Sequence, residues 1–210
     1  MILYIITITF CSAGIIVLNY FVQMPVLDFP LWLNVLGVLV SIVAVIALDG
    51  LIAHICHKLQ NRVNPFSRFF SVSKRQKNLL GAFGAKRYKK FLPDLGALVK
   101  FPKKKIAQPG SKEYIGLYLA ESASGEAGHW IGAAAGFLII FMFPLKYYLC
   151  FGIPVAAVNF ILCVLPALAL RYNRYSLQVI YKGLERRENV RVLTSIPVDG
   201  IAPQISEQIF

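Results

Sequence analysis

The chain has 210 residues, of which 57% are apolar and 15% are charged, and its 22 basic residues against 10 acidic ones give a formal net charge of +12. A soluble domain of this size carries about 25% charged residues and about 45–50% apolar ones, so the composition argues against an ordinary cytosolic enzyme and excludes a disordered chain. Glycine follows no period and there are only four cysteines, which excludes a collagen or a disulfide scaffold. We therefore predict an integral membrane protein.

Four apolar stretches are long enough to cross a bilayer, whose hydrocarbon core needs about 20 helical residues. Residues 3–24 contain no charge, and residues 31–55 contain a single acid, Asp49. Residues 129–170 contain Lys146 as their one charge and are about twice the length of a span, so we divide them near residues 144–148. The sequence predicts an all-α integral membrane protein with four transmembrane helices in two hairpins.

The segments that flank these spans differ strongly in charge. Between residues 56 and 120 there are 15 Lys and Arg residues and two acids, and a second basic segment follows residue 170. The links at residues 23–30 and at Lys146 carry almost no basic residues. Because basic loops favour the cytoplasmic side, we expect a multi-pass cell-membrane protein whose termini and 56–128 segment are cytoplasmic.

The spans divide the chain into four parts. We assign residues 1–55 to the first transmembrane hairpin, 56–128 to a basic amphipathic interfacial or cytoplasmic segment, 129–170 to the second hairpin and 171–210 to a basic cytoplasmic C-terminal segment. In the 56–128 segment aromatic and basic residues alternate, which is typical of a helix in the membrane interface. We expect a few of these cations to bind a phosphate of an anionic donor such as coenzyme A. A nucleic-acid partner is not expected for a chain that four spans anchor.

A candidate for the chemistry lies just before the third predicted span. If residues 121–130 are helical, Glu126 and His129 share a face, and Glu121 could reach the same pocket. An imidazole beside a carboxylate is a plausible general base, and ionisable groups at membrane depth usually have a function. Trp130 is typical of the aromatic residues at a membrane interface, with substrate stacking as the alternative.

A second candidate follows the fourth predicted span, where the sequence reads Arg171-Tyr172-Asn173-Arg174. Arg171 and Arg174 are three residues apart and could clamp a phosphate or a carboxylate, while Asn173 could hold a sugar hydroxyl. The alternative is a stop signal with a snorkelling arginine. The predicted topology places this segment on the same membrane face as His129, so one site could use both.

A metal site is the principal alternative. His54 and His57 are three residues apart at the end of the second span and, with Glu126 and His129, could bind a metal in a membrane oxidoreductase. Such sites usually need the Glu-x-x-His motif twice, so we predict no metal. Cys11, Cys56, Cys150 and Cys163 show no metal-ligand spacing and are interpreted as small hydrophobic residues. A non-catalytic membrane scaffold is the remaining alternative.

The order of these motifs resembles the glycosyl-4,4'-diaponeurosporenoate acyltransferases, which act in the last step of staphyloxanthin synthesis. The matching positions are Glu121, Glu126, His129, Trp130, Arg171, Tyr172, Asn173, Arg174 and Leu177. The stretch 86–94 is similar to the basic-aromatic segment of that family, and the resemblance covers residues 64–187. The chain differs from the family pattern at residues 122–125 and at Tyr175 and Ser176.

The resemblance implies an integral-membrane O-acyltransferase that moves a fatty acyl group from an acyl-CoA or acyl-carrier-protein thioester to a hydroxyl of a lipid-linked sugar or another membrane alcohol. In our hypothesis His129 deprotonates the hydroxyl, Glu126 orients His129, Arg171 and Arg174 hold the donor's phosphate or the oxyanion, and Asn173 binds the acceptor. The expected partners are therefore membrane lipids, the thioester donor and the acceptor. A thioester donor needs no cofactor.

Overall fold

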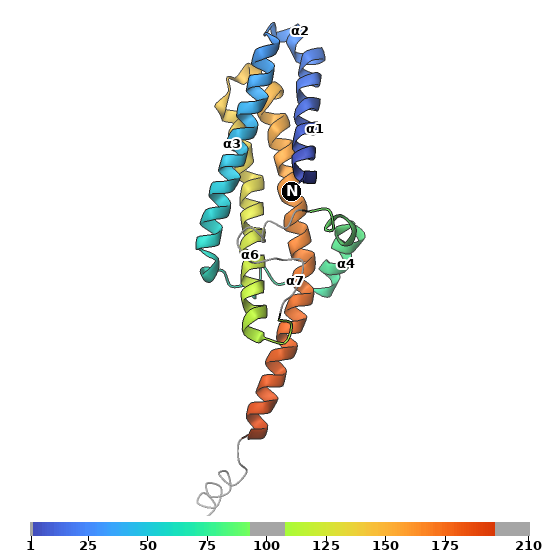
Figure 1. Cartoon of the computed structure of the whole chain (residues 1–210), viewed down its shortest axis with the longest axis vertical. Helices are drawn as coiled ribbons and strands as arrows, with labels where there is room; N and C mark the ends of the chain where they lie inside the picture. The colour runs from blue at the N-terminus through green and yellow to red at the C-terminus, as the bar shows by residue number, and fades with distance from the viewer. Residues whose placement is uncertain (1, 93–107, 196–210) are drawn as a thin grey trace, which may run out of the picture.

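The computed structural model, which describes residues 2–92 and 108–195, is a bundle of long helices without a strand in those residues (Figure 1). The α-helices are α1 (Ile2–Leu18), α2 (Met24–Leu27), α3 (Leu31–Lys58), α4 (Lys74–Ala82), α5 (Ala85–Tyr88), α6 (Lys112–Ala135) and α7 (Ile153–Ser195). Short π or 3-10 turns separate several of them, namely η1 (Asn19–Gln23), η2 (Gln60–Arg62), η4 (Gly136–Met142), η5 (Leu145–Tyr147) and η6 (Tyr148–Gly152). The predicted all-α class is confirmed.

Four segments are long and apolar enough to span a membrane, as the sequence predicts. They are Tyr4–Leu27, Leu31–Lys58, Lys112–Met142 and Leu145–Val192. The first pair turns at Asp28, whose φ of 48° is left-handed, and the second pair turns at Pro144. Because a short turn joins the members of each pair, the four spans form the two predicted hairpins.

The third and fourth helices are longer than the apolar runs that predicted them. Helix α6 begins at Lys112 because the Ser111 side chain caps it, accepting a hydrogen bond of 3.1 Å from the Tyr114 N–H. Helix α7 runs to Ser195, and its part up to Leu184 packs against α6 through a cluster around Leu119 and Leu177. The residues around Glu126 and Arg174 therefore belong to long continuous helices. The end of the predicted 86–94 stretch, at residues 93–94, and the tail beyond residue 195 lie outside the described residues.

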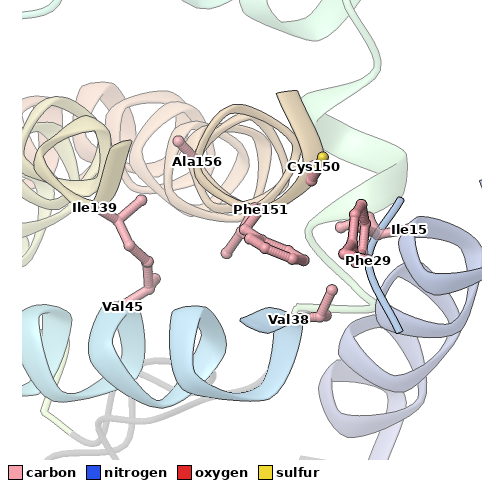
Figure 2. Packing of buried hydrophobic residues seen from close by; sticks show 9 residues of the cluster. Ile15, Phe29, Val38, Val45, Ile139, Cys150, Phe151 and Ala156 are labelled. Atoms are coloured by element: carbon pink, nitrogen blue, oxygen red, sulfur yellow. The ribbon is translucent and has the colours of Figure 1, made fainter. Parts of the chain in front are cut away.

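One hydrophobic core ties the two hairpins together near their turns. Phe151 is buried between α3 and α7 and lies close to Phe29, Val38 and Ile139 (Figure 2). Gly37 makes room for it, since a Cβ there would lie 2.7 Å from the Phe151 ring. The buried Asn19 side chain adds polar links, donating to Asn34 Oδ1 (2.9 Å) and to the Cys150 carbonyl (2.8 Å).

Helix α1 covers only one half of the bundle. Its N-terminal end lies beside the first third of α7, near Leu162, and beyond that level α3, α6 and α7 continue with α4 beside α7 (Figure 1). Gln178 of α7 fixes the chain that leads to α4: its Oε1 accepts from the Val72 N–H (3.1 Å) and its Nε2 donates to the Pro65 carbonyl (3.2 Å). The exposed Phe83, 81% accessible, suits the predicted interfacial role of this segment, which remains a prediction.

Candidate active site

A buried carboxylate between α6 and α7 gathers two arginines and a tryptophan. Glu126 is fully buried on α6, and each of its oxygens accepts a hydrogen bond from an arginine of α7: Arg171 Nη1 at 2.8 Å and Arg174 Nη1. Trp130 Nε1, one turn further along α6, donates to the same carboxylate (3.3 Å). A buried charge is stable only when it is paired and hydrogen-bonded. Glu126 meets that condition, whereas Arg174 Nε has no hydrogen-bond partner in residues 2–92 and 108–195. We define the Glu126 cluster as Glu126, Trp130, Arg171 and Arg174.

The arginines of the Glu126 cluster also hold neighbouring chain segments. Arg174 Nη2 donates to the Ser122 carbonyl (2.7 Å), and the guanidinium lies over the Phe70 ring at 5.2 Å from its centre. Arg171 Nη2 donates to the Phe69 carbonyl (3.0 Å). These contacts join α6, α7 and the chain before α4, so the cluster fixes the positions of three parts of the fold.

A cavity of about 940 Å³ lies beside the cluster, below the N-terminal end of α1. It follows α7 from Leu162 to Leu177, which at 1.5 Å per residue is about 22 Å. The end of the cavity near Leu162, its upper part, is apolar, and the end near Ser176, its lower part, is basic. The apolar lining of α7 consists of Leu162, Leu165, Pro166, Ala169 and Leu170, and the polar lining of the lower part consists of Lys77, Lys89, Lys90, Tyr172, Asn173 and Ser176.

Two of the lysines at the basic end are held by neutral groups. Lys89 Nζ donates to Asn173 Oδ1 (2.9 Å) and lies over the Tyr172 ring at 5.0 Å from its centre. Lys77 Nζ donates to Ser176 Oγ (3.1 Å). Burial, and after it the positive charges of Lys77, Lys86 and Lys90, lower the pKa of Lys89 below the ordinary lysine value. Like charges that lie close together in a cavity favour the binding of an anion.

His129 lines the cavity between these two ends, and Asp49 of α3 lines the apolar end. Gly132, one turn beyond His129 on α6, packs against Asp49. A Cβ on Gly132 would lie 2.7 Å from Asp49 Oδ1. Asp49 Oδ2 accepts a hydrogen bond from Cys163 Sγ (3.5 Å), whereas Oδ1 is buried and has no hydrogen-bond partner in residues 2–92 and 108–195. The cavity is therefore lined by an imidazole of α6 and, at a level about one helical turn further along α6, by a partly satisfied carboxylate of α3.

The structure divides the predicted site residues into three places. His129, Tyr172 and Asn173 line the cavity, and Glu126, Trp130, Arg171 and Arg174 form the adjoining cluster. Glu121 lies toward α3, where its Oε1 is 3.6 Å from Nδ1 of His57. The catalytic and binding roles of all these residues remain predictions. Glu126 accepts hydrogen bonds from Arg171 and Arg174 of α7 and from Trp130.

The alternative metal site needed His54, His57, Glu126 and His129 in one place. His57 pairs with Glu121, and Glu126 pairs with the arginines. In the part of the chain that the structure describes, no three His, Cys, Asp or Glu side chains lie close enough together to hold a metal ion. The geometry therefore gives the oxidoreductase alternative no support.

From the sequence we expect a few cations of the 56–128 segment to bind a phosphate, but the pattern does not indicate which ones, and Asp49 is not among the predicted site residues. The run 86–90 is recognisably basic, but its charges alone do not indicate that Lys89 and Lys77 reach α7. Asp49 had a clearer signal, since an acid inside an apolar span is costly and usually functional.

The comparisons with known proteins agree with the motifs of the site. Residues 66–182, more than half of the chain, match the family model described as glycosyl-4,4'-diaponeurosporenoate acyltransferase. This range includes the Glu126 cluster, His129 and the three cavity lysines. No curated protein and no solved structure matches the chain.

Proposed function

Because this chain belongs to the glycosyl-4,4'-diaponeurosporenoate acyltransferase family, and is thus a membrane acyltransferase of a carotenoid-glycolipid family, we propose a specific reaction for it. The proposed reaction moves a fatty acyl group from a coenzyme A or carrier-protein thioester to a hydroxyl of a sugar on a lipid-like acceptor. The reaction takes place in the cavity that His129 lines.

The observation that carries this proposal is the change in character along the cavity, from an apolar end to a basic one. A fatty acyl thioester has the same division, since its chain is apolar and its carrier bears phosphates. The lysines Lys77, Lys89 and Lys90 supply charge for those phosphates. The thioester carbonyl then lies between the two ends, at the level of His129.

In the proposed reaction His129 removes the proton of the acceptor hydroxyl, whose oxygen attacks the thioester carbonyl. The tetrahedral intermediate collapses as its carbon–sulfur bond breaks, and the imidazolium returns the proton to the leaving thiolate. Asn173 and Tyr172, which line the cavity, are placed to bind polar groups of the substrates. The products are an ester and a free thiol, so no redox partner is needed.

The Glu126 cluster has a different part in this scheme. The guanidinium of Arg174 is fully buried, and both arginines bind Glu126. We propose that Glu126, Arg171 and Arg174 act as positioning residues that hold α6 and α7 together, and that the lysines contact the donor. Asn173 lies between the two arginines in sequence, so fixing them also fixes Asn173 beside Lys89.

The position of the cavity along the membrane supports a cytoplasmic site. Asp49 is 18 residues from Leu31, or about 27 Å of helix, which nearly equals a hydrocarbon core of about 30 Å. The cavity then begins at the membrane boundary opposite the Asp28 turn. We propose that this boundary is cytoplasmic, as are both termini, because the basic residues lie beyond it and thioester donors are made in the cytosol.

Mass spectrometry of lipids from cells that express the chain tests the proposal. We expect a lipid that is heavier by one acyl group with the intact chain and its absence with His129→Ala. The matched control is His54→Ala, which removes an exposed histidine of α3 and should leave the product unchanged. Equal amounts of product with His129→Ala and with the intact chain would contradict the assignment of the base.

A further inference from the structure

A second cavity, of about 260 Å³, lies between α1, α3 and α7. It adjoins the first cavity at three residues that line both, Tyr4, Asp49 and Leu162. From there it follows α1 toward the turn of the first hairpin. The junction is at the apolar end of the first cavity, which is the end that the proposed function gives to the acyl group.

The chemistry of this cavity suits a hydrocarbon. Its lining is mostly aliphatic, and the side chains of Ser12 and Asn159 are hydrogen-bonded within the protein, whereas Asp49, at the junction, keeps one oxygen without a hydrogen-bond partner in residues 2–92 and 108–195. Ser12 Oγ donates to the Ile8 carbonyl (2.6 Å), and Asn159 Nδ2 donates to the Gly132 carbonyl (3.4 Å). Because an apolar cavity offers water few partners, it favours an apolar ligand over water.

The length of the cavity matches one acyl chain. Along α1 its lining runs from Tyr4 to Ile15, which is about 16 Å at 1.5 Å per residue, or roughly half of a hydrocarbon core of about 30 Å. At the far end the lining includes Ile15, which belongs to the buried core around Phe151 (Figure 2), and Ile42, which packs against that core. The cavity therefore ends against packed side chains.

We propose that this second cavity binds the fatty acyl chain of the donor and that its closed end limits the length of the chain that is transferred. The proposal rests on the proposed function, in which the thioester lies at His129. It goes beyond the family match, because α1 and α3 lie outside residues 66–182. Chain-length preference is thus set by the first hairpin, whereas the reaction uses the second.

The test is photolabelling of the purified full chain with palmitoyl-coenzyme A that carries a diazirine at the end of its acyl chain. We expect the label on α1 and α3 near Ile15 and Ile42 and its loss from these positions in Ile8→Trp, which fills the middle of the cavity. The matched control is Ile6→Trp, because Ile6 is 56% exposed and does not line the cavity. The label should stay near Ile15 in this control.

The alternatives give different results. Absence of label from α1 and α3, or equal labelling of Ile8→Trp and the intact chain, would overturn the proposal. So would equal labelling by a phosphatidylcholine with the same diazirine chain, since a bilayer lipid would then be the occupant. If the protein is labelled near Ile15 but transfers no acyl group, the result would support the cavity assignment and contradict the proposed function instead.

Discussion

The Glu126 cluster and the basic end of the cavity both place cations along the same part of α7, but these cations have different kinds of partner. In the cluster, Arg171 and Arg174 meet a buried carboxylate, so their charges are neutralised in part within the fold. In the cavity, Lys89 and Lys77 meet an amide oxygen and a hydroxyl. The difference indicates that the arginines stabilise the protein, whereas the lysines keep charge available for a ligand.

The largest expected effect comes from the Glu126 cluster. Replacing Glu126 with Gln leaves two arginines, one of them fully buried, without a counter-charge, and we expect a loss of about 3–5 kcal/mol in the free energy of unfolding. Unfolding of the purified protein in detergent measures it. Adding Arg174→Met to Glu126→Gln should recover part of the loss, because one uncompensated charge is removed. An unchanged stability in Glu126→Gln would remove the distinction between the two regions.

A substitution at Gly132 tests whether the stability of the protein also depends on close packing at the apolar end of the cavity, where Gly132 contacts Asp49. In Gly132→Ala the new Cβ would lie 2.7 Å from Asp49 Oδ1, so we expect a displaced carboxylate and a loss of about 1–3 kcal/mol in stability. Gly14→Ala is the control, because a Cβ there meets nothing within 4 Å. Equal stability of the two variants would show that Asp49 moves away freely.

A smaller effect is expected from Lys77. Lys77→Met removes one of the cations that face the cavity, and we expect the KM for the donor to rise about tenfold, since a charge-assisted hydrogen bond contributes about 1.5–3 kcal/mol. The unfolding temperature should not change. Arg75→Met, on the exposed side of α4, is the control and should leave KM unchanged. A lower unfolding temperature without a change in KM would indicate that Lys77 stabilises the protein, as the arginines do, and does not bind the donor.

The pH dependence gives the smallest effect. Because burial and neighbouring lysines lower the pKa of Lys89, it loses its charge at a lower pH than an ordinary lysine. The affinity for an anionic donor should therefore fall as the pH rises through the Lys89 pKa. In Lys89→Arg the fall should move to higher pH, because arginine stays protonated. The KM for the donor, measured across the alkaline range, checks this, and identical profiles would contradict the role of Lys89.

The sequence predicts the four spans well because apolar runs reflect membrane thickness directly. It does not predict where α6 begins, since residues 112–128 are too polar to be recognised as part of a span and are fixed by the Ser111 cap and by packing on α7. The shared face of Glu126 and His129 depends on residues 121–130 being helical, and α6 meets that condition. The pairing of Glu126 with Arg171 and Arg174, 45 and 48 residues away, depends on how α6 packs against α7, which composition and spacing do not reveal.

The measurement that most directly tests the account is the unfolding temperature of the purified protein with and without coenzyme A. For the intact chain we predict a rise, because a ligand that binds the folded state stabilises it by about 2.7 kcal/mol at 100 times its Kd. Lys89→Met should unfold at the same temperature as the intact chain without coenzyme A and show little rise with it. An equal rise in Lys89→Met and the intact chain would contradict the assignment of the basic end to the donor.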